Sequence, residues 1–211
     1  MKKVSKLLIV LLSLAVIVAA LVIVSSASSG NSAKIGDKEY ETLQEALRAA
    51  KDGDEIVLIS DAFIDTSYKV DKSVSIDLGG HTLEACSNAF NVTGDITFTV
   101  KGNGKIYASG IFVSTYKGND AVPTVGIIGD GYGIDVEAAS GIFTSSRNGN
   151  LKFKNLNVTA GPTPNNKGVF HNEVDSDARF EFVAVEVIAP EGAANYSSII
   201  RFGNETYAKI D

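Results

Sequence analysis

The chain of 211 residues contains one cysteine, no tryptophan, two histidines and four prolines. Because Cys86 is alone, no disulfide can form within the chain, and we interpret it as a small buried residue. Two histidines and one cysteine do not support the usual zinc sites or histidine-based triads, and no Gly-x-Ser-x-Gly sequence occurs. The composition therefore points away from disulfide scaffolds, zinc enzymes and serine hydrolases, and no cofactor is expected.

Positive charge is also scarce. The net charge is −6, the pI is near 5.0, and the arginines are Arg48, Arg147, Arg179 and Arg201. Without a basic stripe to neutralise phosphates, nucleic acid is not expected as a partner. Pectate lyases need clustered acidic Ca²⁺ ligands and an arginine base, whereas polygalacturonase-type hydrolases need paired carboxylates. The repeats contain no Asp-Asp pair and no such cluster, so we predict no catalytic residues and no metal site.

The first 30 residues read as an export segment. Lys2, Lys3 and Lys6 precede an apolar run over residues 7–24 that only Ser13 interrupts. This run is longer than the usual core of a signal peptide and short for a spanning helix. Residues 1–30 are therefore predicted to be either a signal peptide, cleaved near Ser25-Ser26-Ala27, or a membrane anchor. Both interpretations place the rest at the cell surface or outside the cell, with membrane contact only through an uncleaved segment.

An apolar pair, usually ending in Phe, recurs five times along the remaining chain. The second residues of the pairs are spaced by 22, 31, 27 and 30 positions, and the pairs are Ala89-Phe90, Ile111-Phe112, Ile142-Phe143, Val169-Phe170 and Ile199-Ile200. A period of this size is typical of a stacked solenoid, in which each repeat buries its apolar face against its neighbours. We expect the second residues, four Phe and Ile200, to form one inward column.

Between the apolar pairs lie two further β-rich runs, separated by turns of Gly, Asn and Asp. Residues 96–100 alternate between apolar and polar, break at Gly102-Asn103-Gly104 and resume over residues 105–108. Residues 129–133, which are rich in glycine, are read as a bend because no helix follows them. Three short strands per repeat predict an all-β, single-stranded parallel β-helix. A β-propeller is the weaker alternative, since its blades need about 40 residues.

The two ends of this solenoid, predicted over residues 34–211, differ. Thr42 and Glu45 form a capping-box sequence, and an apolar stripe follows it through residue 50, with Gly53 placed to end the helix. We expect this helix to cover the N-terminal end of the solenoid, which would otherwise expose core and unpaired backbone. The last repeat stops partway, at Asp211, so the domain is predicted to be C-terminally incomplete.

The N-terminal part of the chain resembles the beginning of a known type of domain. The residues that carry the resemblance are 40–47 (Tyr-Glu-Thr-Leu-Gln-Glu-Ala-Leu), 50–58 (Ala-Lys-Asp-Gly-Asp-Glu-Ile-Val-Leu) and 70–83 (Val-Asp-Lys-Ser-Val-Ser-Ile-Asp-Leu-Gly-Gly-His-Thr-Leu). They resemble the first turns of right-handed β-helix domains of the pectin lyase-like superfamily, as in secreted bacterial surface proteins. The resemblance implies a right-handed parallel β-helix. It implies no particular activity, because that superfamily includes lyases, hydrolases, adhesins and inert spacers.

One polar cluster is a candidate ligand site. His171, Glu173 and Arg201 fall on the same predicted outward face, with Arg147 at the end of the neighbouring strand. Such a strip can bind an oligosaccharide, and a solvated surface with ordinary cross-strand pairs is the alternative. The other histidine, His81, follows Gly79-Gly80 and is interpreted as a turn residue.

The sequence therefore favours a non-enzymatic extracellular β-helix module of a bacterial surface or secreted protein, for adhesion or glycan binding. Its expected partner is an extracellular polysaccharide or a host glycan. Two alternatives stay open. One is the N-terminal part of a polysaccharide lyase or glycoside hydrolase whose catalytic residues lie beyond the chain, and the other is an inert structural spacer.

Overall fold

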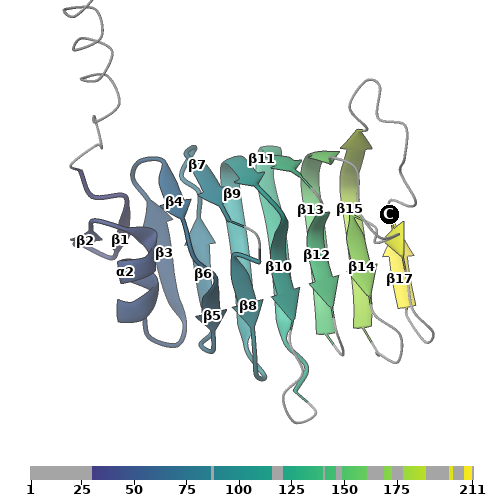
Figure 1. The fold of residues 1–211 in the computed structure, drawn as a ribbon, viewed down its shortest axis with the longest axis horizontal. Helices are drawn as coiled ribbons and strands as arrows, with labels where there is room; N and C mark the ends of the chain where they lie inside the picture. The colour runs from purple at the N-terminus through teal and green to yellow at the C-terminus, as the bar shows by residue number, and fades with distance from the viewer. Residues whose placement is uncertain are drawn as a thin grey trace, which may run out of the picture. The chain divides into compact units, whose positions relative to one another are not determined.

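The computed structural model describes residues 30–86, 88–115, 121–139, 141–145, 149–160, 169–172, 178–188, 200–201 and 207–210. The predicted export segment falls outside these ranges. Within them, no helix has both the length and the apolar character needed to cross a membrane. Residues 31–211 form one compact unit, and most of its described residues lie in strands (Figure 1).

The described strands belong to two sheets. The larger, eleven-stranded sheet contains β1 (Ala33–Ile35), β2 (Lys38–Tyr40), β3 (Asp54–Leu58), β4 (Ala62–Ile64), β6 (Val74–Asp77), β7 (Thr82–Ala85), β9 (Thr97–Ala108), β11 (Thr124–Ala138), β13 (Gly149–Ala160), β15 (Ala178–Ile188) and β17 (Tyr207–Ile210). The six-stranded sheet contains β5 (Tyr68–Val70), β8 (Phe90–Val92), β10 (Ile111–Thr115), β12 (Gly141–Ser145), β14 (Phe170–Asn172) and β16 (Ile200–Arg201).

Successive coils of the chain stack in parallel. Beginning with β3, each coil contributes one or two strands to the larger sheet and then one strand to the smaller sheet. Examples are β9 followed by β10, and β11 followed by β12. The pairs that strands β3 to β17 form with one another are all parallel, whereas β1 pairs antiparallel with β3. Figure 1 shows the coils side by side from β3 to the yellow β17. The parallel β-helix predicted from the sequence is thus confirmed, and pairing between coils rules out propeller blades.

The core consists of columns, in each of which an inward side chain of one coil stacks on the aligned side chain of the next coil. One column runs through the larger sheet in register and comprises Ile56, Ile76, Val100, Ile127, Phe153 and Phe182. All six are buried. The β-branched and aromatic residues pack well on a pleated surface, so each coil stabilises its neighbours through contacts that no single coil could make alone.

The predicted phenylalanine column differs from the observed one at a single strand. In the six-stranded sheet, Val113 pairs with both Phe90 and Phe143, so Phe112 is one residue out of that column. Phe112 is nevertheless fully buried, as is Ala89, which precedes Phe90. Within β10 the consecutive residues Phe112 and Val113 are both buried, whereas Ile111 is only partly buried. Period-two alternation does not hold at the start of this strand, so the prediction for Phe112 was wrong by one position.

The N-terminal cap combines the predicted helix with a hairpin that the sequence did not reveal. Helix α2 (Leu43–Ala49) begins where Thr42 Oγ1 accepts a hydrogen bond from the Glu45 amide, at 3.2 Å. Its buried residues Leu43, Ala46 and Leu47 face the core. Figure 1 shows α2 beside β3, next to the antiparallel pair β1–β2. Gly53, expected to end the helix, instead lies in the turn before β3 with a φ of +87°.

The glycine-rich stretch before Ile134 is a bend, as predicted. Strand β11 is out of register with both neighbours between Ile128 and Ile134. At Gly133, where φ is +89°, an added Cβ would lie 2.6 Å from the Asn155 carbonyl oxygen of the next coil. Glycine is needed there because the backbone of β13 passes too close for any side chain.

Candidate functional site

The predicted polar strip lies on the six-stranded sheet, and the register brings two of its four members together. His171 in β14 pairs with Arg201 in β16 and, on its other side, with Thr144 in β12. The same column continues through Ser114, Asn91 and Lys69. Glu173 and Arg147 lie outside the described residues. The expected adjacency of His171 and Arg201 along the solenoid is therefore confirmed for the backbone.

Hydrogen bonds within this column involve its own side chains. Asn91 Nδ2 donates to Ser67 Oγ at 2.6 Å, and Ser114 Oγ donates to Asn91 Oδ1. Ser67 Oγ in turn donates to the Asn88 carbonyl oxygen, again at 2.6 Å. Both ends of the Asn91 amide are thus engaged with neighbouring coils. This part of the column stabilises the stacking of the coils and offers few polar atoms to a ligand.

His171 differs from the prediction in its exposure. It was expected on an outward, solvated face, but only 8% of its surface is accessible. Exposure falls along the column, from Lys69, which is exposed, through the partly buried Asn91 and Ser114, to His171. The two residues before it, Val169 and Phe170, are also buried. The expected alternation of buried and exposed residues does not hold here, because three consecutive residues are buried. A buried imidazole cannot stack on a glycan.

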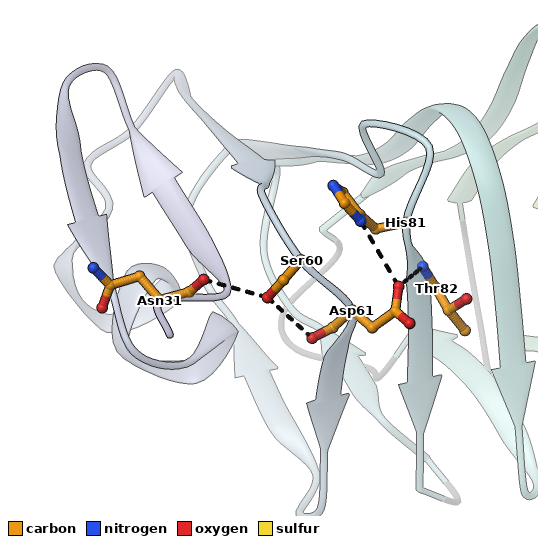
Figure 2. Close-up of polar contacts among 5 residues, drawn as sticks. All are labelled: Asn31, Ser60, Asp61, His81 and Thr82. Atoms are coloured by element: carbon orange, nitrogen blue, oxygen red, sulfur yellow. Dashed lines mark hydrogen bonds and ion pairs between the residues drawn. The ribbon is translucent and has the colours of Figure 1, made fainter. Parts of the chain in front are cut away.

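The second histidine, His81, lies at an exposed turn near the N-terminal end (Figure 2). Its backbone amide donates to the Leu78 carbonyl, and its carbonyl accepts from the Lys105 amide. Its Nδ1 is 3.8 Å from Asp61 Oδ1, which also accepts from the Thr82 amide at 2.8 Å. The interpretation of His81 as a turn residue agrees with these backbone contacts.

Ser60 completes the group in Figure 2 without forming a catalytic relay. Its hydroxyl donates to two backbone carbonyls, those of Asn31 at 3.3 Å and Asp61 at 3.5 Å. A nucleophilic serine would instead need a hydrogen bond from its hydroxyl to the imidazole. The contact of 3.8 Å between His81 and Asp61 is also too long for the hydrogen bond that orients a catalytic base. The arrangement joins coils and does not activate the hydroxyl.

The sequence analysis missed a different row of side chains, which lies on the outer surface of the larger sheet. Phe63 in β4 pairs with Glu84 in β7, Glu84 pairs with Tyr107 in β9, and Tyr107 pairs with Glu137 in β11. We call these four residues the aromatic–acid row. The same column continues through Thr159 in β13 and Ile188 in β15. Aromatic and acidic side chains thus alternate from coil to coil along the solenoid.

The row is exposed although it contains large apolar groups. The accessible fraction is 55% for Phe63 and 45% for Tyr107, and Glu84 is exposed as well. The residues on either side of Tyr107 in β9, Ile106 and Ala108, are buried. The row therefore stands on a firmly packed sheet, and its aromatic rings lack the burial that usually stabilises such side chains.

The charges along the row are not balanced. Glu137 forms an ion pair with Lys105, which stands beside it on β9, and both side chains are about half exposed. The hydrogen bond to Glu137 raises the pKa of Lys105 above its usual value, so the ammonium stays protonated. In the next outward column, Asp135 accepts a hydrogen bond from Asn157 at 2.9 Å. Glu84 and Asp135 thus leave this surface with excess negative charge.

A signal for this row was present in the sequence. Phe63 stands between Ala62 and Ile64, and Tyr107 stands between Ile106 and Ala108, so both aromatics take the outward phase of their strands. The sequence did not show which residues of successive coils are aligned, because the turns between strands differ in length. In the part of the chain that the structure describes, no group of His, Cys, Asp and Glu is arranged to hold a metal ion.

Comparison of the chain with protein-family models, with curated proteins and with solved structures gives no match.

Proposed function

We propose that this protein is a non-catalytic β-helix module that acts outside the cell, in glycan binding or adhesion. The observation that carries the proposal is the aromatic–acid row, with its two half-exposed rings in one column. Exposed aromatic side chains cost free energy in water, and they gain it when they bury the apolar face of a sugar ring. Carboxylates beside them accept hydrogen bonds from hydroxyl groups.

Two features of the sequence support the extracellular setting. The basic and apolar start of the chain is that of an export segment. Residues 38–85 resemble the opening of β-helix domains in the pectin lyase-like superfamily, and we propose membership of that superfamily on this resemblance. Secreted bacterial surface proteins that carry such domains work outside the cytoplasm. The proposed partner is accordingly an extracellular polysaccharide or a glycan on a host surface.

A rigid solenoid suits this task. The four strands of the row are paired with one another in sequence, and β7, β9 and β11 are paired on both sides, so its spacing is held by backbone hydrogen bonds. A ligand meets side chains that are already in place, and little conformational entropy is lost when it binds. The same rigidity would serve an inert spacer, which differs from the proposed module only in lacking a ligand.

The test is to expose the purified protein to a panel of neutral and acidic polysaccharides and to measure retention and product release together. We expect retention on at least one glycan without release of reducing or unsaturated sugar. Release of sugar would favour the lyase or hydrolase alternative. Absence of retention on every member of the panel would favour the spacer.

A further inference from the structure

We propose that the aromatic–acid row binds a linear, neutral, β-linked polysaccharide chain that runs along the solenoid axis, across strands β4, β7, β9 and β11. Phe63 and Tyr107 stack on alternate sugar rings, and Glu84 between them accepts hydrogen bonds from hydroxyl groups. This inference rests on the proposed glycan binding and names its site, its ligand class and the direction of the bound chain.

The spacing of the two aromatic rings suggests the direction. Phe63 and Tyr107 lie in one register column with a single strand, β7, between them. Neighbouring strands are about 4.8 Å apart, so the two side chains arise roughly 9.5 Å from one another along the axis. In a β-1,4-linked chain, alternate pyranose rings present the same face, and the repeat is a disaccharide of similar length. A chain along the axis can therefore meet both aromatics with equivalent rings.

The charge of the row suggests which glycans fit. Glu84 lies between the two aromatics and is exposed, while Glu137 keeps its own counter-ion, Lys105. A uronic acid chain on this path would bring its carboxylates within a few ångströms of Glu84. Two like charges this close repel each other near a protein surface, which weakens binding of an acidic chain. A neutral sugar avoids this repulsion and supplies hydroxyl donors for the carboxylate.

At Glu84 and Tyr107 the backbone of the row argues against a peptide added as a strand, whereas β4, which carries Phe63, pairs among the described strands with β7 alone. Extended peptides bind sheets by pairing with an unpaired edge. The strands that carry Glu84 and Tyr107 are each paired on both sides, so their backbone donors and acceptors are already used. Binding on this face must come from side chains, which suits stacking on sugar rings.

The experiment compares hexasaccharides that differ in charge, with cellohexaose as the neutral probe and hexagalacturonate as the acidic one. Affinity is measured by calorimetry for the wild-type protein and four variants. We expect the wild-type protein to prefer cellohexaose. Tyr107→Ala should bind it about ten-fold more weakly, whereas Tyr107→Phe, which keeps the ring, should bind within about two-fold of wild type. Val122→Ala is the matched control, because Val122 is 41% exposed but lies outside the row.

The fourth variant, Glu84→Lys, tests the charge argument. It should reverse the preference, with hexagalacturonate binding at least as tightly as cellohexaose, because the repelling charge is replaced by an attracting one. A wild-type protein that prefers hexagalacturonate would overturn the inference and leave the proposed glycan binding intact. Equal losses in Tyr107→Ala and Val122→Ala would also overturn it. If the wild-type protein binds neither hexasaccharide, the inference fails; if it also binds no member of the polysaccharide panel, the proposed function itself fails.

Discussion

The ring of Phe112 meets the ring of Phe90 edge-on, with centroids 5.3 Å apart and planes at 86°. The two residues belong to adjacent coils, β10 and β8, and both are fully buried. A T-shaped aromatic pair of this kind adds to the free energy already gained by burial. The pair stabilises the contact between two adjacent coils at the start of β8 and β10 in the six-stranded sheet.

The first prediction follows from this pair. Phe112→Ala should lower the free energy of unfolding by about 3–5 kcal/mol, because a large buried side chain is lost and the coils above and below cannot close the cavity. Denaturant unfolding followed by circular dichroism measures the change. Phe63→Ala is the control, since that ring is 55% exposed, and it should change the stability by less than about 0.5 kcal/mol. Similar losses in both variants would contradict the assigned core.

The second prediction concerns two glycines of the bend in β11. Gly131 and Gly133 both have positive φ, at +51° and +89°, but only Gly133 lies close to the next coil. Gly131→Ala should cost about 1 kcal/mol from the left-handed backbone alone. Gly133→Ala should cost clearly more, because its Cβ would overlap the Asn155 carbonyl oxygen. Equal unfolding midpoints for the two variants would show that β11 and β13 do not approach as described.

The third prediction uses the single thiol. Burial, followed by the negative charge of Asp65, raises the pKa of Cys86. Because the raised pKa favours the neutral thiol, the reactive thiolate is scarcer in the folded protein than in the unfolded one at neutral pH. Labelling by a thiol reagent should therefore be slower in buffer than in denaturant, and the rate in buffer should still rise at alkaline pH. Equal rates in the two solvents would contradict this environment.

Much of the fold could be predicted from the sequence, because the relevant signals are local. Alternation in residues 96–100 and 105–108 is visible without knowing any partner, and it became strand β9. The helix start at Thr42 was equally local. The register between coils could not be predicted from local signals, because it depends on the number of residues in each turn. A register that differs by one residue in β10 was enough to place Val113 where Phe112 was expected.

The candidate site depends on register even more strongly than the core does. Phe63 and Tyr107 are 44 positions apart in the sequence. They lie in one column, with Glu84 between them, only when β4, β7 and β9 are aligned. The predicted pairing of His171 with Arg201 was correct because both follow an apolar pair directly. The exposure of His171 was not predictable, because alternation specifies a direction along one strand and not what covers it.

The most direct test of the central claim, that sugar rings stack on the aromatic–acid row, uses the absence of tryptophan from the chain. Tyr107→Trp places the only indole in the row, and Val122→Trp places it at an exposed position outside the row. Titration of each variant with cellohexaose is followed by tryptophan emission. The account predicts a saturable change in emission for Tyr107→Trp and none for Val122→Trp. Cellohexaose binding that is measurable by calorimetry in Tyr107→Trp but leaves its emission unchanged would contradict the claim.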